Sequence, residues 1–118
     1  MPHIKLEYTE NVQWKSPIYD IFPKLETVLA QHAKVNPKNC KSRATKLNDY
    51  YCTDKNRSGG FIHLEISLLS GRDEEVKTNI GKECRQIIQS FIDNIADIQV
   101  SVELRNMDQS SYFTTNQL

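Results

Sequence analysis

The chain has 118 residues, and its 15 lysines and arginines balance its 15 aspartates and glutamates. This length fits one domain with a two-layer core, and the balanced charge excludes the global basic field that attracts nucleic acid. No apolar run approaches the ~20 residues that span a bilayer. The three cysteines lack CxxC spacing and the three histidines lack metal-site spacing. We therefore expect a cytoplasmic protein with reduced thiols, without a metal or cofactor, and without a nucleic-acid or membrane partner.

The first predicted element is a strand over residues 2–8. Ile4, Leu6 and Tyr8 alternate with polar residues at period two, and Pro2 falls in phase with this apolar set. Proline is tolerated as the first residue of a strand, so Pro2 can simply initiate it. If Met1 is removed, however, Pro2 becomes a free secondary amine. In a desolvated site beside cations, such an amine has a lowered pKa and can act as a general base.

A first helix is predicted after Ser16-Pro17, a pair typical of an N-cap and its following residue. Apolar residues between Ile18 and Leu29 recur at helical spacing. Pro23 interrupts this pattern, so either the helix begins later, near Asp20, or it kinks at the proline.

The remaining elements are predicted from the same two patterns, the alternation typical of strands and the apolar spacing typical of helices. They are a turn over 36–39, a strand over 41–51 with a possible irregularity at 48–49, a loop over 54–60, a strand over 61–68, a helix with an apolar stripe over 76–92, and a strand over 98–104. The acidic run Asp73–Glu75 favours the start of the second helix through the helix dipole. Residues 107–118 are polar and form either a C-terminal arm on a partner subunit or a frayed end.

The order of elements is β-α-β followed by β-α-β. Two right-handed units of this kind predict an α/β (α+β) fold, with a four-stranded mixed sheet and two helices on one face. Periodicity leaves open a ferredoxin-like split arrangement or a repeat of two equivalent β-α-β halves. Either leaves the other face of the sheet without helices, and we expect neighbouring subunits to cover it.

Basic residues stand where strands begin or end. Lys41 and Arg43 share one face at the start of the second strand, and Arg72 lies between the third strand and the second helix. Beside a neutral amine, such cations would lower its pKa and bind an anionic substrate, and an arginine fork fits a carboxylate. Taken singly, each can instead be a solvated surface charge, and it is their combination with Pro2 that favours a site. The pattern alone requires no structural partner for Arg72.

Short motifs in a particular order point to a known family. They are Pro2-His3-Ile4 with Glu7 and Asn11, Lys41-Ser42-Arg43, and Ser70-Gly71-Arg72. Together they resemble the 5-carboxymethyl-2-hydroxymuconate Δ-isomerase family of the tautomerase superfamily, from Pro2 to about Leu104.

The resemblance implies one tautomerase-like domain over 1–118 that assembles as a homotrimer with pockets between subunits. It implies an isomerase of aromatic compound catabolism, which moves a proton in a small unsaturated keto or enol dicarboxylic acid. Pro2 would be the base, Arg72 would contact the substrate at the catalytic centre, and Lys41 and Arg43 would bind it. Lys41 stands where the family usually has arginine, which leaves the exact substrate open.

Two alternatives remain at this point. If Met1 stays on the chain, the Pro2 nitrogen is an amide without basic character. The protein would then be a non-catalytic trimeric binding protein of the same fold. The second alternative is a ferredoxin-like regulatory domain, which needs no free N-terminus.

Overall fold

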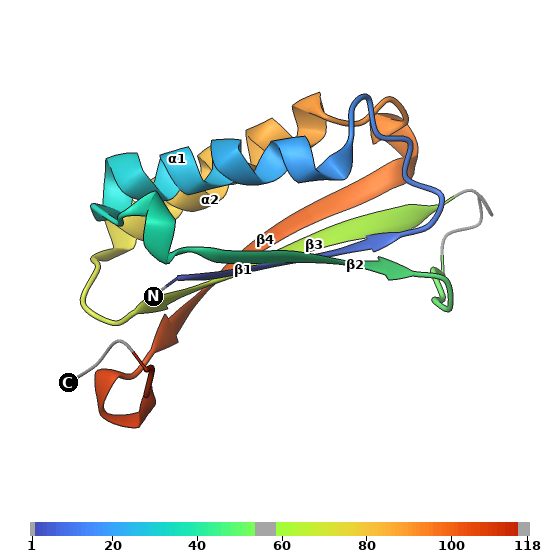
Figure 1. Cartoon of the computed structure of the whole chain (residues 1–118). Coiled ribbons are helices and arrows are strands. Elements are labelled where there is room, and N and C mark those ends of the chain that lie inside the picture. The colour runs from blue at the N-terminus through green and yellow to red at the C-terminus, as the bar shows by residue number, and fades with distance from the viewer. Residues whose placement is uncertain (1, 54–58, 116–118) are drawn as a thin grey trace.

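The computed structural model describes residues 2–53 and 59–115, and its centre is one sheet with two helices on the same face (Figure 1). The strands lie in the order β2-β1-β3-β4, with bounds β1 (His3–Thr9), β2 (Lys41–Leu47), β3 (Gly60–Leu69) and β4 (Ile98–Met107). β1 is parallel to β2 and antiparallel to β3, and β3 is parallel to β4. The predicted mixed sheet of two β-α-β units is confirmed.

Helix α1 (Ile21–Ala33) begins later than the first apolar residues of its pattern. A 3-10 turn at Ile18–Asp20 precedes it, so the later of the two predicted starts is correct. Ser16-Pro17 does not open the α-helix, because Pro17 only precedes this 3-10 turn. Pro23 then falls in the first helical turn, where a missing N–H leaves no helical bond unmade.

Helix α2 (Glu74–Ser90) begins where its acidic run predicts. The side chain of Asp73 is its N-cap and accepts a hydrogen bond from the backbone N–H of Val76 at 2.9 Å. The chain runs along α2 in the direction opposite to α1, and both helices cover the same sheet face (Figure 1). The two β-α-β halves are therefore similar units that run in opposite directions.

Two strand boundaries differ from the prediction by three residues or more. β2 ends at Leu47 rather than at residue 51, because Asn48 and Asp49 form a bend. β4 continues to Met107, and a 3-10 turn at Gln109–Ser111 follows within the predicted arm. Most of the predicted loop over 54–60 lies outside the described residues, as does the end of the arm.

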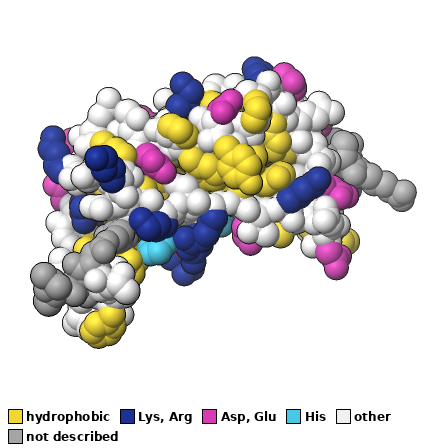
Figure 2. Space-filling model, in the orientation of Figure 1, with side chains coloured by type: hydrophobic (Ala, Val, Ile, Leu, Met, Phe, Trp, Pro, Cys, Tyr) yellow, Lys and Arg dark blue, Asp and Glu magenta, His cyan; other side chains and the backbone are white. Residues whose placement is uncertain are grey.

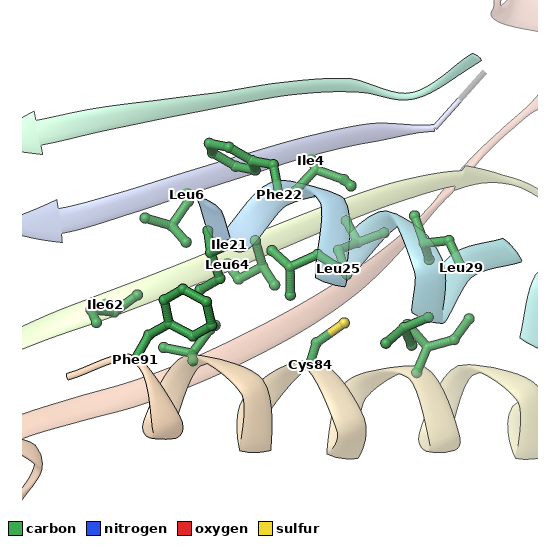
Figure 3. Packing of buried hydrophobic residues seen from close by; sticks show 14 of the residues in the cluster. Ile4, Leu6, Ile21, Phe22, Leu25, Leu29, Ile62, Leu64, Cys84 and Phe91 are labelled. Carbon is green, nitrogen blue, oxygen red and sulfur yellow. The ribbon is translucent and has the colours of Figure 1, made fainter. Parts of the chain in front are cut away.

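The core lies between the helices and the sheet (Figure 3). Ile4 and Leu6 of β1 point into it, and helix side chains such as Leu25 and Cys84 meet them from the other side. Each large aliphatic side chain buried here contributes roughly 1.5–3 kcal/mol. Burial raises the pKa of the Cys84 thiol to about 12, so this cysteine is a core residue rather than a reactive one.

The other face of the sheet is polar. Lys5 of β1 pairs with Glu65 of β3 at 3.5 Å, and Arg105 of β4 lies 3.4 Å from the same carboxylate. Arg105 also contacts Glu103 at 3.3 Å. The centre of this face is therefore a network of charges, and its cover by neighbouring subunits stays a prediction.

Candidate active site

A pocket of about 190 Å³ lies at the end of the sheet where β1 begins and β3 ends. Pro2, which is buried, lines it together with Leu68 and Leu69 of β3 and with Arg72. The strand alternation explains why Pro2 is here, because it shares the helix-facing side of β1 with Ile4. The structure therefore brings two residues singled out in the sequence, Pro2 and Arg72, to one pocket.

Arg72 has structural partners, contrary to the expectation from its pattern. Its Nη1 donates to the carbonyl oxygen of Leu69 at 2.8 Å, and its Nη2 donates to the carbonyl oxygen of Ala33 at 3.2 Å. The second bond satisfies one of the carbonyls that a helix leaves unpaired at its C-terminus. A guanidinium has five N–H donors. Two of them hold the backbone, and the cation still faces the Pro2 pocket.

Lys34 is a second basic residue that lines this pocket, and sequence reasoning missed it. It ends α1 in the left-handed conformation, with φ of 58°, and its N–H bonds to the carbonyl oxygen of Leu29. Glycine usually takes this place, since a side chain makes it costly. The available signal was a helix pattern ending at Ala33 with no glycine after it. A strained residue that persists beside a pocket is a candidate for function.

Lys41 and Arg43 lie on the opposite face of the sheet from the Pro2 pocket. Ser42, between them, faces the helices and bonds to Glu26 of α1 at 2.7 Å, so its two neighbours face away. The backbone N–H of Lys41 donates to the carbonyl oxygen of Pro2 at 3.0 Å. The side chain of Arg43 contacts the His3 ring at 3.1 Å. Within one chain, these two cations therefore do not join Pro2 and Arg72.

A larger hollow, of about 700 Å³, lies at the other end of β3. Glu7, Phe61 and His63 are among its lining residues. It contains none of the predicted site residues, so we place the candidate site at Pro2.

Within residues 2–53 and 59–115, no three histidine, cysteine, aspartate or glutamate side chains are grouped to hold a metal ion. In the same part of the chain, neither helix has the length and apolar character needed to cross a membrane.

The family model for 5-carboxymethyl-2-hydroxymuconate isomerase matches residues 2–118. The chain belongs to this family. The resemblance read from the motifs at Pro2, Lys41 and Ser70 is thereby confirmed. No curated protein sequence matches the chain closely enough to count as a relative.

Solved structures agree with the family assignment. A 5-carboxymethyl-2-hydroxymuconate isomerase from Deinococcus radiodurans R1 is 26% identical, with a TM-score of 0.82 over 98% of this chain and 90% of that one. A fused 4-OT wild-type symmetric trimer is 14% identical, with a TM-score of 0.76 over 98% of this chain and 94% of that one. A 5-carboxymethyl-2-hydroxymuconate delta-isomerase is 15% identical, with a TM-score of 0.71 over 100% of this chain and 89% of that one. The last two show the fold alone, which is tautomerase-like. Family and fold together support an isomerase function.

Proposed function

We propose that this member of the 5-carboxymethyl-2-hydroxymuconate isomerase family is a tautomerase that uses Pro2, after loss of Met1, as its general base. The observation that carries this is the shared pocket: Pro2 and Arg72 both line it, and Lys34 adds a second cation. A buried amine beside two cations is held neutral near pH 7, because desolvation and like charge both disfavour its protonated form. Such an amine can remove a proton from a substrate.

The substrate that fits this charge is a small unsaturated keto or enol dicarboxylic acid. The Pro2 nitrogen takes a proton from a carbon or an enol oxygen of the substrate and leaves a conjugated dienolate. The same proton then returns to a different carbon, so no oxidant or other reactant is needed. Arg72 and Lys34 bind carboxylate or enolate oxygens and stabilise the negative charge as it develops.

The proposed roles of Lys41 and Arg43 as substrate-binding cations need a second copy of the chain. Both side chains are exposed on the helix-free face, away from their own Pro2 pocket. In a homotrimer with pockets between subunits, they would serve the pocket of a neighbour. A monodisperse monomer at micromolar concentration, measured by light scattering, would contradict this arrangement.

The decisive assay is the ketonisation of a 2-hydroxymuconate-type dienol by the Met1-free protein. Mass spectrometry first establishes whether Met1 is absent, and the matched control is the same protein with its N-terminus acetylated. We expect turnover well above the buffer rate for the free amine and none above it for the acetylated form. No turnover by either would favour the alternative, a non-catalytic trimeric binding protein with the same fold.

A further inference from the structure

His3 uses both nitrogens of its ring, although the sequence pattern offers it no role. Its Nδ1 lies 3.1 Å from Nη1 of Arg43, and its Nε2 lies 3.0 Å from the hydroxyl of Tyr112. The His3 and Tyr112 rings also meet edge to face, with centroids 5.9 Å apart. The tyrosine comes from the C-terminal arm, 109 positions further along the chain. The arm is thus fastened to the first residue of β1.

The chemistry of arginine decides the protonation of this ring. A guanidinium can only donate, so Nδ1 of His3 must accept from Arg43. The proton of the neutral ring is then on Nε2, which donates to the Tyr112 oxygen. Burial, followed by the charges of Arg43, Lys5 and Lys41, lowers the pKa of His3 below its ordinary value.

The surroundings of His3 contain no compensating acid among the described contacts. Lys5 lies on its own strand and Lys41 and Arg43 on β2, while its β3 register partner is the uncharged Ser67. Figure 2 shows lysine and arginine side chains gathered beside a histidine near the C-terminal arm. A protonated His3 would face Arg43 without an acceptor. The contact between Nδ1 of His3 and the Arg43 guanidinium therefore exists only while the His3 ring is neutral.

Three contacts of Pro2 and His3 restrain the chain end. The Pro2 carbonyl oxygen accepts from the N–H of Lys41 at 3.0 Å, and the following residue is His3 with its two ring contacts. Without Met1, Pro2 keeps a single peptide bond, and a chain end with few restraints frays. A displacement of about 1 Å can cost a reaction a factor of about 100.

We propose that His3 is a positioning residue: held by Arg43 and by Tyr112 of the C-terminal arm, it fixes the direction in which the Pro2 nitrogen enters its pocket. This inference rests on the proposed function of Pro2. The arm thereby contributes to the reaction without lining the pocket, and protonation of His3 releases the restraint.

The first test compares two tyrosine variants in the Met1-free full chain. Tyr112→Phe removes the hydroxyl and keeps the ring, and Tyr19→Phe does the same at an exposed tyrosine of the 3-10 turn before α1. We expect Tyr112→Phe to lower kcat roughly tenfold or more with KM within about twofold, and Tyr19→Phe to match the parent. Equal kcat for Tyr112→Phe and the parent, both folded, would overturn the proposal.

The second test is a pH profile of His3→Gln, whose amide still offers one donor and one acceptor but does not titrate near neutral pH. As the pH falls through the pKa of His3, log(kcat/KM) of the parent should drop by about one unit more than that of His3→Gln, because protonation of His3 releases the restraint while Pro2 titrates in both proteins. His3→Gln should retain most of the activity at pH 7 and show only the limb that belongs to Pro2. Profiles of the same shape in both proteins would remove His3 from the reaction.

A third measurement separates failure of this proposal from failure of the proposed function. Nitrogen NMR reports the tautomer of His3 and the pKa of the Pro2 amine, whether or not the protein turns over any substrate. We expect the Nε2–H tautomer in the parent, and in Tyr112→Phe a Pro2 pKa that moves up toward the ordinary 7.7–8.0. If the parent is inactive and the Pro2 pKa nevertheless rises in Tyr112→Phe, the proposed function is wrong and the restraint of Pro2 by His3 stands. An unchanged Pro2 pKa in Tyr112→Phe would overturn the restraint itself.

Discussion

Arg72 donates a hydrogen bond from Nη2 to the carbonyl oxygen of Ala33, 3.2 Å away, and so ties the end of α1 to the segment that precedes α2. The same guanidinium lines the Pro2 pocket. It both shapes the pocket wall and supplies charge to the pocket. A variant at this position must therefore be judged on stability and on activity at once.

We expect Arg72→Ala to lower the free energy of unfolding by about 1.5–3 kcal/mol, because two backbone carbonyls lose a charged donor. Turnover of a dicarboxylic dienol should fall by roughly one to two decades in addition. Urea unfolding and steady-state kinetics on the same samples measure the two effects. Arg72→Lys is the matched control: it keeps the charge and loses the fork, so activity should fall less than in Arg72→Ala. Full activity in Arg72→Ala would remove this residue from the site.

Lys34 gives a prediction in which stability and activity move in opposite directions. Lys34→Gly should raise the free energy of unfolding by up to ~1 kcal/mol, since glycine adopts the left-handed conformation without strain. It should also raise KM for a dicarboxylate, because the pocket loses a cation. Lys34→Arg keeps the cation and the strained backbone, so neither quantity should change much. A Lys34→Gly protein with an unchanged KM would show that this lysine does not touch substrate.

The pH profile of kcat/KM tests the base. Its ascending limb should lie below the ordinary α-amino value of about 7.7–8.0, because Arg72 and Lys34 disfavour protonation of Pro2. Pro2→Ala leaves a primary amine and should reduce activity without abolishing it. Retention of Met1 should abolish it, since an amide nitrogen cannot accept the proton. Normal turnover by a protein that retains Met1 would exclude Pro2 as the base.

Replacement by alanine should lower the stability of the protein at one glycine and raise it at another. A Cβ at Gly60, the first residue of β3, would clash with the side chains of Asn11 and Thr9. Gly60→Ala should therefore cost roughly 1–3 kcal/mol of stability, through overpacking beside the buried Thr9. Gly81 in the middle of α2 has room, with Cδ2 of Leu104 at 3.5 Å. Gly81→Ala should stabilise the protein by about 0.5–1 kcal/mol, as measured by urea unfolding. A stable Gly60→Ala variant would contradict this packing.

Acid should destabilise the protein in part through His3. Its pKa in the folded chain is lowered from the ordinary 6.5, first by burial and then by Arg43. The stability that the neutral ring contributes is complete above pH 6.5 and is lost as the pH falls through the lower folded pKa. Urea unfolding at a series of pH values should show this loss for the parent and a flatter curve for His3→Gln. Identical curves would mean that the folded protein does not perturb His3.

The sequence was sufficient for the order of elements and for most of their bounds. Alternation around Ile4 and Leu64 and the helical stripe through Cys84 reflect which side chains must leave water, and that requirement is local. The cap at Asp73 is also local. The first helix was harder, because Pro23 is compatible both with a late start and with a kink, and only packing of Ile21 into the core selects the start.

The tertiary structure decided which charges meet. Alternation places Lys41 and Arg43 on one face of their strand, but the contact of Ser42 with α1 sets which face that is. Three relationships depend on residues far apart in the chain, namely Arg72 with Ala33, Lys34 with Pro2, and His3 with Tyr112. Periodicity carries no information about such pairs, because a side chain can reach a distant carbonyl or hydroxyl only after the core has brought the strand and helix ends together.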